Sequence, residues 1–259
     1  MTLNFNKYQA NGNDFIIFNN FSNNLPKEQA FIKKICSRKF NVGADGVIFV
    51  ENCKSYDFEM LYFNSDGKLG SLCGNGARCC AKFAFDQGLI KNRTSFKAND
   101  GVHHCIIDDD IVHLSMNDIE KIECHENDII LDSGSPHYIK IVDNVEKMNV
   151  LKIGQEIRNS EYFKKDGINV NFVEIVSKKE FKIRTYERGV ENETLSCGTG
   201  ATAVAIAMHF LNKTTSEKIE IISIGGKLSV KFKKYKNSYN QIFLVGEAKK
   251  VYSGEINYK

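Results

Sequence analysis

Short runs in which apolar and polar residues alternate predict that strands make up most of this chain. Residues 58–64 read Phe-Glu-Met-Leu-Tyr-Phe-Asn, and residues 181–187 read Phe-Lys-Ile-Arg-Thr-Tyr-Glu. These two segments have the same pattern although they lie in different halves of the chain. Further strands are expected at residues 15–18, 47–50, 111–114, 129–131 and 227–232.

Two segments have the pattern of a helix rather than of a strand. Residues 77–86 are followed by Gly88, a typical C-terminal helix cap, and residues 201–211 are apolar on almost every face. A helix that is apolar all round must be buried, so we expect a curled, mainly antiparallel sheet around it. A further helix is expected over residues 27–38, on the outside of the first half of the chain.

The two halves of the chain repeat one arrangement of strand, polar stretch and glycine-rich turn. The turns are residues 71–77 (Ser-Leu-Cys-Gly-Asn-Gly-Ala) and residues 195–201 (Leu-Ser-Cys-Gly-Thr-Gly-Ala). Two copies at this long period indicate a duplicated domain. We therefore predict an α+β fold with two pseudo-symmetric domains, residues 1–116 and 117–245, each a curled sheet around a central helix. The functional cleft is expected between them.

Composition and charge exclude several functional classes. Hydrophobic residues make up 42% of the 259 residues and the formal net charge is +3, which is typical of neither a disordered chain nor a nucleic-acid-binding surface. The N-terminus lacks the pattern of a secretory signal. The longest uncharged stretch, residues 194–212, has an apolar part of only about 11 residues, too short to span a bilayer. We expect a cytoplasmic protein without a membrane or nucleic-acid partner.

The eight cysteines are not expected to form a disulfide framework, because the cytoplasm keeps thiols reduced. No Cys-x-x-Cys spacing occurs, which argues against the alternative of a thiol redox or metal-binding protein. Most free cysteines pack as small buried hydrophobes. We expect such packing for six of them: Cys36, Cys53, Cys79, Cys80, Cys105 and Cys124.

Cys73 and Cys197 differ because each stands in one of the repeated turns, at or just before the N-terminus of a helix. The helix macrodipole and the free N–H groups there favour negative charge, lower the pKa of a thiol and bind carboxylates. Two such thiols can remove a proton from one face of a carbon and deliver one to the other face, which inverts a stereocentre. Arg188, beside the second turn, is a candidate clamp for a distal carboxylate. The alternative is two strand-to-helix turns with merely buried cysteines.

Several short motifs are spread over nearly the whole chain. They are residues 11–15 (Asn-Gly-Asn-Asp-Phe), 43–46 (Gly-Ala-Asp-Gly), 63–67 (Phe-Asn-Ser-Asp-Gly), 73–79 (Cys-Gly-Asn-Gly-Ala-Arg-Cys), 134–137 (Gly-Ser-Pro-His), 169–172 (Asn-Val-Asn-Phe), 186–189 (Tyr-Glu-Arg-Gly) and 197–200 (Cys-Gly-Thr-Gly). Together they resemble diaminopimelate epimerase. The resemblance implies interconversion of LL- and meso-2,6-diaminopimelate without a cofactor or a metal, on the route to lysine and peptidoglycan. It also implies a homodimer and a C-terminal strand, residues 246–259, that returns to the first domain.

The resemblance assigns roles to individual residues. It makes the thiols of Cys73 and Cys197 catalytic, and His137 and Glu187 look like the groups that tune thiol protonation. Asn64, Asn169 and Arg188 would hold the distal amino-acid end of the substrate. The full set of implied substrate contacts is Asn13, Asn64, Asn169, Glu187 and Arg188, with the backbone amides of Gly74, Asn75, Gly198 and Thr199 next to the reacting carbon.

Three positions depart from the pattern. Gly46 stands where some members have glutamine, Ser135 replaces the common asparagine before Pro-His, and one extra residue in the stretch 191–193 must bulge. The sequence leaves open whether Ser135 and Gly46 contact substrate, and whether Cys73 and Cys197 form a disulfide on oxidation. Another amino-acid racemase of this fold is the alternative function. Racemases of proline-like substrates typically carry Cys-Gly-His-Gly, however, and the phenazine-biosynthesis type lacks the cysteine pair.

Overall fold

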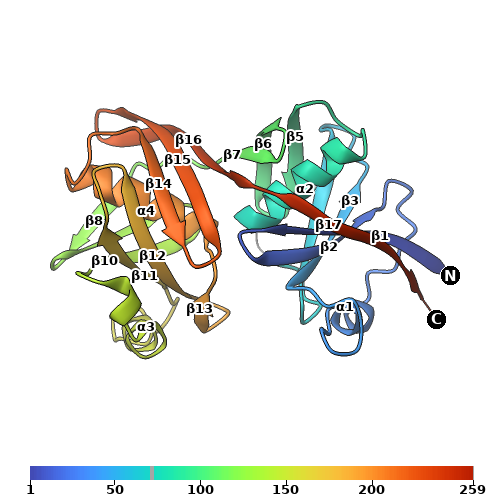
Figure 1. Ribbon diagram of the computed structural model, residues 1–259, viewed down its shortest axis with the longest axis horizontal. Helices are drawn as coiled ribbons and strands as arrows, with labels where there is room; N and C mark the ends of the chain where they lie inside the picture. The colour runs from blue at the N-terminus through green and yellow to red at the C-terminus, as the bar shows by residue number, and fades with distance from the viewer. Residues whose placement is uncertain (71–72, 259) are drawn as a thin grey trace. The chain divides into compact units, whose positions relative to one another are not determined.

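The computed structural model describes residues 1–70 and 73–258, so Ser71 and Leu72, the first residues of the first turn, lie outside the described part. The chain forms two compact units (Figure 1). The first comprises Met1–Leu114 and Gly246–Lys259, and the second comprises Ser115–Val245.

The first unit is one mixed sheet built from both ends of the chain. Its strands are β1 (Thr2–Ala10), β2 (Asn13–Asn19), β3 (Gly46–Glu51), β4 (Phe58–Asn64), β5 (Arg93–Ala98), β6 (Gly101–Asp108), β7 (Ile111–Ser115) and β17 (Lys249–Asn257). Their spatial order is β17–β1–β2–β3–β4–β5–β6–β7. The pairs β2–β3 and β4–β5 are parallel and the other neighbours are antiparallel.

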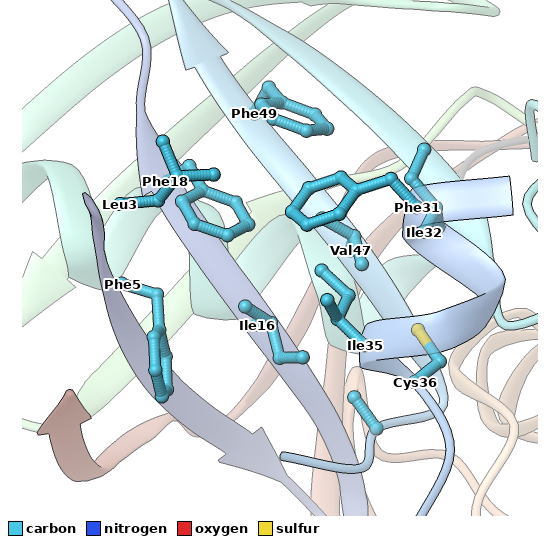
Figure 2. Packing of buried hydrophobic residues seen from close by; sticks show 11 residues of the cluster. Leu3, Phe5, Ile16, Phe18, Phe31, Ile32, Ile35, Cys36, Val47 and Phe49 are labelled. Atoms are coloured by element: carbon cyan, nitrogen blue, oxygen red, sulfur yellow. The ribbon is translucent and has the colours of Figure 1, made fainter. Parts of the chain in front are cut away.

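Two helices, α1 (Gln29–Ile35) and α2 (Gly74–Asp86), cover opposite faces of this sheet. Figure 2 shows the α1 side, where Phe31 and Ile35 pack in one cluster with Phe18 and other strand residues. On the other side, the rings of Tyr8 in β1 and Phe83 in α2 have centroids 5.8 Å apart. Because both faces are covered, β3 is buried at every position, and its residues 47–50 form a continuous apolar run rather than an alternation.

The second unit has the same construction. Its strands are β8 (Ile122–His125), β9 (Asp128–Asp132), β10 (Pro136–Ile141), β11 (Asn169–Ile175), β12 (Glu180–Glu187), β13 (Asn192–Thr194), β14 (Lys218–Ser223), β15 (Gly226–Tyr235) and β16 (Ser238–Glu247). They follow the order β8–β9–β10–β11–β12–β14–β15–β16, with β13 paired to β12. The pairs β10–β11 and β12–β14 are parallel.

Helices occupy equivalent places in the two units. In the second unit, α3 (Val150–Arg158), preceded by the short 3-10 helix η1 (Val145–Lys147), follows β10 as α1 follows β2. The helix α4 (Gly198–Phe210) follows β12 and β13 as α2 follows β4, and it is buried along nearly its whole length. The succession of parallel and antiparallel pairs is also identical in the two sheets. This identity confirms the duplication that the two turns predict.

Three predicted features differ from the structure. The first helix is shorter than the predicted residues 27–38, because Glu28 is extended and the chain turns after Cys36. Residues 150–158 form α3, for which no helix was predicted. The two central helices begin at Gly74 and Gly198, three residues earlier than predicted, because the turn glycines belong to the first helical turn.

The packing of the six remaining cysteines also differs in part. Cys36, Cys79, Cys80 and Cys105 are buried as expected, whereas Cys53 is half-buried and Cys124 is exposed. The prediction is wrong for Cys124 because no position of β8 is buried. Among the described residues, no helix is long and apolar enough to cross a membrane.

Candidate active site

The first turn places Cys73 directly before α2, as the N-cap residue. The thiol donates to Oδ1 of Asn13 at 3.3 Å, and the side-chain amide of Asn75 donates to the same oxygen at 3.4 Å. Asn13 in turn donates from Nδ2 to Oδ2 of Asp45 at 2.7 Å. The β1–β2 hairpin and the start of α2 are therefore connected at the sulfur of Cys73.

A buried arginine in α2 donates hydrogen bonds to side chains of this turn and of the β1–β2 hairpin. Arg78, in the second turn of α2, is completely buried, and its Nη2 donates to Oδ1 of Asn11 at 2.8 Å and of Asn75 at 2.9 Å. Burial lowers the pKa of Arg78 from its ordinary value, but a guanidinium stays protonated in proteins. No carboxylate forms an ion pair with it among residues 1–70 and 73–258. The motif 73–79 contains Arg78, yet the sequence alone does not show that its charge lies under the turn.

The second turn places Cys197 before α4 in the same way. Its sulfur accepts from the backbone N–H of Gly200 at 3.4 Å and lies 3.4 Å from the hydroxyl of Thr199. The prediction that both cysteines stand at helix N-termini is thus confirmed. At such a position the first backbone N–H groups have no intrahelical acceptor and are available to an anion. Those groups include the N–H of Gly74 and Asn75 in one unit and of Gly198 and Thr199 in the other.

Glu187, at the end of β12, lies beside Cys197. Its carboxylate accepts from the hydroxyl of Thr194 at 3.1 Å and has a hydrogen bond with Cys197. Burial raises the pKa of Glu187 above its ordinary value, and these two hydrogen bonds partly oppose the rise. In the stretch 191–193, where a bulge is expected, Glu191 has a positive φ of 55° and the chain enters the short hairpin of β12 with β13.

His137, in β10, is fully buried on the side of the sheet that α4 covers. Its Nε2 lies 2.9 Å from Oγ1 of Thr199, and its Nδ1 lies 3.0 Å from Nδ2 of Asn171. Burial, and to a smaller extent the charge of Arg188, lower the pKa of His137 to about 3. The ring is therefore neutral at physiological pH. Asn171 was not singled out from the sequence, although it alternates with the predicted Asn169 along one strand and so shares its face.

Asn169 and Arg188 lie together at the edge of this site. Asn169 donates to the hydroxyl of Ser135 at 2.8 Å and to the carbonyl of Pro136 at 3.0 Å, and its Oδ1 accepts from the backbone N–H of Arg188 at 2.9 Å. The guanidinium of Arg188 donates to the carbonyl of Asp166 at 2.8 Å and reaches Ser135 at 3.5 Å. Ser135 therefore connects the two predicted contact residues within the protein.

Asn64 and Gly46 lie side by side at the ends of β4 and β3, where they form one register pair. Asn64 is exposed. Gly46 lies under the ring of Tyr62, so that a Cβ at this position would come within 2.5 Å of Cε2. A larger residue at position 46 would displace Tyr62, which is a physical reason for glycine here.

The two turns belong to different units. The first unit brings Asn13, Cys73 and Asn75 together, and the second brings together His137, Asn169, Glu187, Arg188, Cys197 and Thr199.

Other cysteines have a different environment. Burial raises the pKa of Cys36 to about 12 and raises that of Cys79, Cys80 and Cys105 as well, so these thiols stay protonated.

Metal binding is the remaining chemistry that cysteines and histidines suggest. Within residues 1–70 and 73–258, no group of three or more His, Cys, Asp or Glu side chains is arranged to hold a metal ion. The arrangement that the structure does show is a thiol at a helix N-terminus, once in each unit, with polar side chains around it. Such an arrangement can exchange a proton next to a bound carboxylate.

Comparison with known sequences gives a consistent picture. A family model described as diaminopimelate epimerase matches residues 5–121 and 129–251. The chain is 48% identical over 252 residues to a diaminopimelate epimerase of Flavobacterium psychrophilum, covering 96% of this chain and 98% of that relative. It is 34% identical over 272 residues to a diaminopimelate epimerase of Aquifex aeolicus, with 97% and 96% covered.

Two solved structures with the same fold have much lower sequence identity to this chain. A phenazine biosynthesis protein of the PhzF family from Bacillus anthracis has a TM-score of 0.78 at 16% identity, and the match covers 100% of both chains. A probable proline racemase from Agrobacterium radiobacter has a TM-score of 0.69 at 12% identity, with 99% of this chain and 93% of the other covered. At such low identities, the likeness shows that the fold is shared and nothing more.

Proposed function

Because this chain belongs to the diaminopimelate epimerase family, we propose that it interconverts LL- and meso-2,6-diaminopimelate with the thiols of Cys73 and Cys197 as paired base and acid. The reaction supplies a precursor of lysine and peptidoglycan. One observation carries the proposal: two equivalent helices of a duplicated fold each begin directly after a cysteine. The conditions that favour a thiolate are thus present twice, once in each unit.

The proposed chemistry moves one proton off the α-carbon and another proton onto it. One cysteine, as thiolate, takes the α-proton, and the electron pair of the broken C–H bond is delocalised into the neighbouring carboxylate. The other cysteine, as thiol, gives its proton to the opposite face of the carbon, so the stereocentre is inverted. The two sulfurs have then exchanged protonation states, and the reverse reaction uses them in the opposite roles.

The electron pair that this step leaves behind needs positive potential at the carboxylate. The backbone N–H groups of Gly74, Asn75, Gly198 and Thr199 supply it at the starts of α2 and α4. Since the carboxylate itself takes up the electrons, the mechanism requires neither a cofactor nor a metal. Glu187 and His137, which lie around Cys197 and Thr199, would tune the protonation of that thiol.

The distal end of the substrate carries a second carboxylate and a second amino group. Arg188 is the cation that we assign to this carboxylate, because guanidinium pairs with carboxylate in a bidentate geometry. Asn169 donates to Ser135 and to Pro136, the first residue of β10, and accepts from the backbone N–H of Arg188. These hydrogen bonds hold Arg188 in place. Asn64, exposed at the end of β4, is the polar contact that we assign from the first unit.

The decisive test is epimerisation in deuterated water by metal-free protein in the presence of reductant. We expect deuterium to enter the α-carbon of diaminopimelate. Cys73→Ala and Cys197→Ala should each lower the rate by about 10²- to 10⁴-fold, the range for loss of a proton-transferring group. Cys124→Ala is the matched control, since Cys124 is an exposed cysteine on β8, and it should act at the wild-type rate.

Two outcomes would contradict the proposal in different ways. A Cys73→Ala or Cys197→Ala protein that epimerises at the normal rate rules out the two-thiol mechanism. A protein that prefers a monocarboxylic amino acid over diaminopimelate is instead another racemase of this fold, and Arg188 then has no distal carboxylate to bind.

The assembly and the compartment follow from the same proposal. We propose that the protein is a homodimer, because its resemblance to the family implies one. Sedimentation velocity of the purified protein measures the oligomeric state. A monomer at micromolar concentration contradicts the homodimer. We place the enzyme in the cytoplasm because both proposed catalytic thiols must stay reduced, and fractionation of the native cell tests this placement.

A further inference from the structure

A line of polar side chains runs beneath the second turn and ends at the sulfur of Cys197. Thr185, Asn171 and His137 lie on the neighbouring strands β12, β11 and β10, and Thr199 lies in the first turn of α4 (Figure 1). The three strand residues are at most 2% exposed. Buried polar groups are costly unless each donor meets an acceptor. The direction of every hydrogen bond in the line therefore follows from its partners.

The orientation of the Asn171 amide is determined first. The backbone carbonyl of Tyr138, which can only accept, lies 3.1 Å from Nδ2 of Asn171. The hydroxyl of Thr185 donates to Oδ1 of Asn171 at 2.9 Å. Turning the amide over would bring its oxygen against the Tyr138 carbonyl. The second N–H of Nδ2 therefore points at Nδ1 of His137, 3.0 Å away.

The orientation of Asn171 decides the tautomer of His137. Since Nδ1 accepts a hydrogen bond from Asn171, the single proton of the neutral ring is on Nε2. Nε2–H then donates to Oγ1 of Thr199 at 2.9 Å. The charged group that also acts on the ring is Arg188, which together with burial disfavours the imidazolium.

The last bond in the line reaches the proposed catalytic sulfur. Oγ1 of Thr199 accepts from His137 and has its single hydrogen left to donate. The thiolate of Cys197 has no hydrogen and can only accept, so in that state the O–H is directed to Sγ, 3.4 Å away. The carbonyl of Thr199 is held by the hydroxyl of Ser133 at 2.8 Å. The sulfur thus faces two donors, Thr199 and the N–H of Gly200, besides its contact with Glu187.

We propose that Asn171 is a positioning residue for Cys197: it holds His137 as the Nε2–H tautomer, which turns the Thr199 hydroxyl toward the sulfur and stabilises the thiolate. The inference rests on the proposed function, in which Cys197 must pass through the thiolate. It gives His137 no proton transfer of its own. It also explains the second glycine of the turn, because a Cβ at Gly200 would lie 2.6 Å from Oδ1 of Asn171.

The hydroxyl is tested by the alkylation rate of Cys197 with iodoacetamide, followed by mass spectrometry of its peptide. Thr199→Val keeps the shape and the backbone amide but removes the donor, so we expect alkylation about tenfold slower at neutral pH. Thr199→Ser should restore the wild-type rate. Thr202→Val is the matched control, since the Thr202 hydroxyl donates to the carbonyl of Gly198 at 3.1 Å instead. An unchanged rate in Thr199→Val overturns the proposal.

The tautomer is tested by nitrogen-15 NMR of His137. We expect an Nε2–H ring that does not titrate down to about pH 5. Asn171→Asp places an acceptor opposite Nδ1, so the ring in that variant should carry a proton on Nδ1. A wild-type ring protonated on Nδ1 overturns the proposal. If Asn171→Asp does not fold, the wild-type NMR spectrum and the alkylation rates of the Thr199 variants still test the proposal.

These measurements separate the inference from the proposed function. Neither alkylation nor NMR requires diaminopimelate, so a protein that fails to epimerise this substrate leaves both results valid while the proposed function fails. If the wild-type protein epimerises diaminopimelate normally but Thr199→Val is alkylated at the wild-type rate, the positioning role is refuted and the proposed function stands.

Discussion

At the scale of single residues, Asp14 is the carboxylate on which the charges near the first turn converge. Its two oxygens accept from Lys7 at 2.9 Å and from Arg38 at 2.6 and 2.9 Å. Arg38 also bonds Asp45, whose carboxylate holds Asn13. Burial disfavours the charged form of Asp14, but the hydrogen bonds from Arg38 and Lys7 outweigh it and hold its pKa well below the ordinary value.

Asp14→Asn should therefore destabilise the protein in a pH-dependent way. A group whose folded-state pKa is depressed stabilises the fold above its unfolded pKa of about 4 and loses this contribution as the pH falls. We expect the free energy of unfolding to drop by about 2 kcal/mol at neutral pH, because Lys7 is left buried without its anion. The difference from wild type should shrink below about pH 4.

Urea unfolding at several pH values measures this difference. Asp118→Asn, at an exposed carboxylate, is the control and should change the stability by less than about 0.5 kcal/mol. If the free energies of unfolding of Asp14→Asn and wild type differ by a constant amount down to pH 3, the ionised carboxylate of Asp14 does not stabilise the fold through Lys7 and Arg38.

At the scale of elements, the same glycine-rich turn precedes α2 and α4 but packs against different neighbours in the two units. Gly76 and Gly200 occupy equivalent positions in the two turns. A Cβ on Gly76 would lie 3.3 Å from the ring of Phe15, whereas a Cβ on Gly200 would lie 2.6 Å from Oδ1 of Asn171 and 3.2 Å from Cβ of Cys197. The glycine of the second turn thus has less space around it than the glycine of the first.

We predict that Gly200→Ala is the more damaging of the two substitutions. Overpacking against Asn171 should cost about 1–3 kcal/mol and displace the amide that faces His137. Gly76→Ala needs only a few tenths of an ångström of movement by Phe15, and the alanine favours the helix. Scanning calorimetry of both variants measures the difference, and an equal or larger loss in Gly76→Ala would contradict the packing argument.

At the scale of the whole molecule, the first unit depends on the C-terminal end of the chain. The strand β17 pairs with β1 from Thr2 to Gln9. The ring of Tyr258, just beyond β17, packs against Phe31 of α1 with centroids 5.1 Å apart. The second unit contains no residue after Val245.

Truncation after Glu247 should therefore weaken one unit selectively. We expect faster amide hydrogen exchange in β1, whose hydrogen-bond partners are lost, and in α1, while β10, β11 and β12 keep their protection. Removal of Lys259 alone is the control and should leave exchange in both sheets unchanged. Equal loss of protection in both units would show that they unfold as one cooperative body.

Part of the fold could be predicted from sequence because the relevant signals are local. The strand at residues 58–64 has the bounds of β4, and the apolar residues 201–211 indicated a buried helix, which α4 is. The helix α3 was missed because Gly154 weakens its helical pattern. The structure shows why glycine is needed there: a Cβ would lie 2.4 Å from Cβ of Tyr186.

The sequence by itself determined the duplication, the fold class, the family and the two cysteines at helix starts, because a turn motif and its glycines are continuous strings. Only the tertiary structure decided what surrounds each sulfur. Asn171, Thr185 and the carbonyl of Tyr138 meet His137 because three strands pair in one register. Arg78 becomes a buried cation because a sheet closes around α2. Hydrogen-bond direction and burial depend on partners distant along the chain, and no local pattern encodes them.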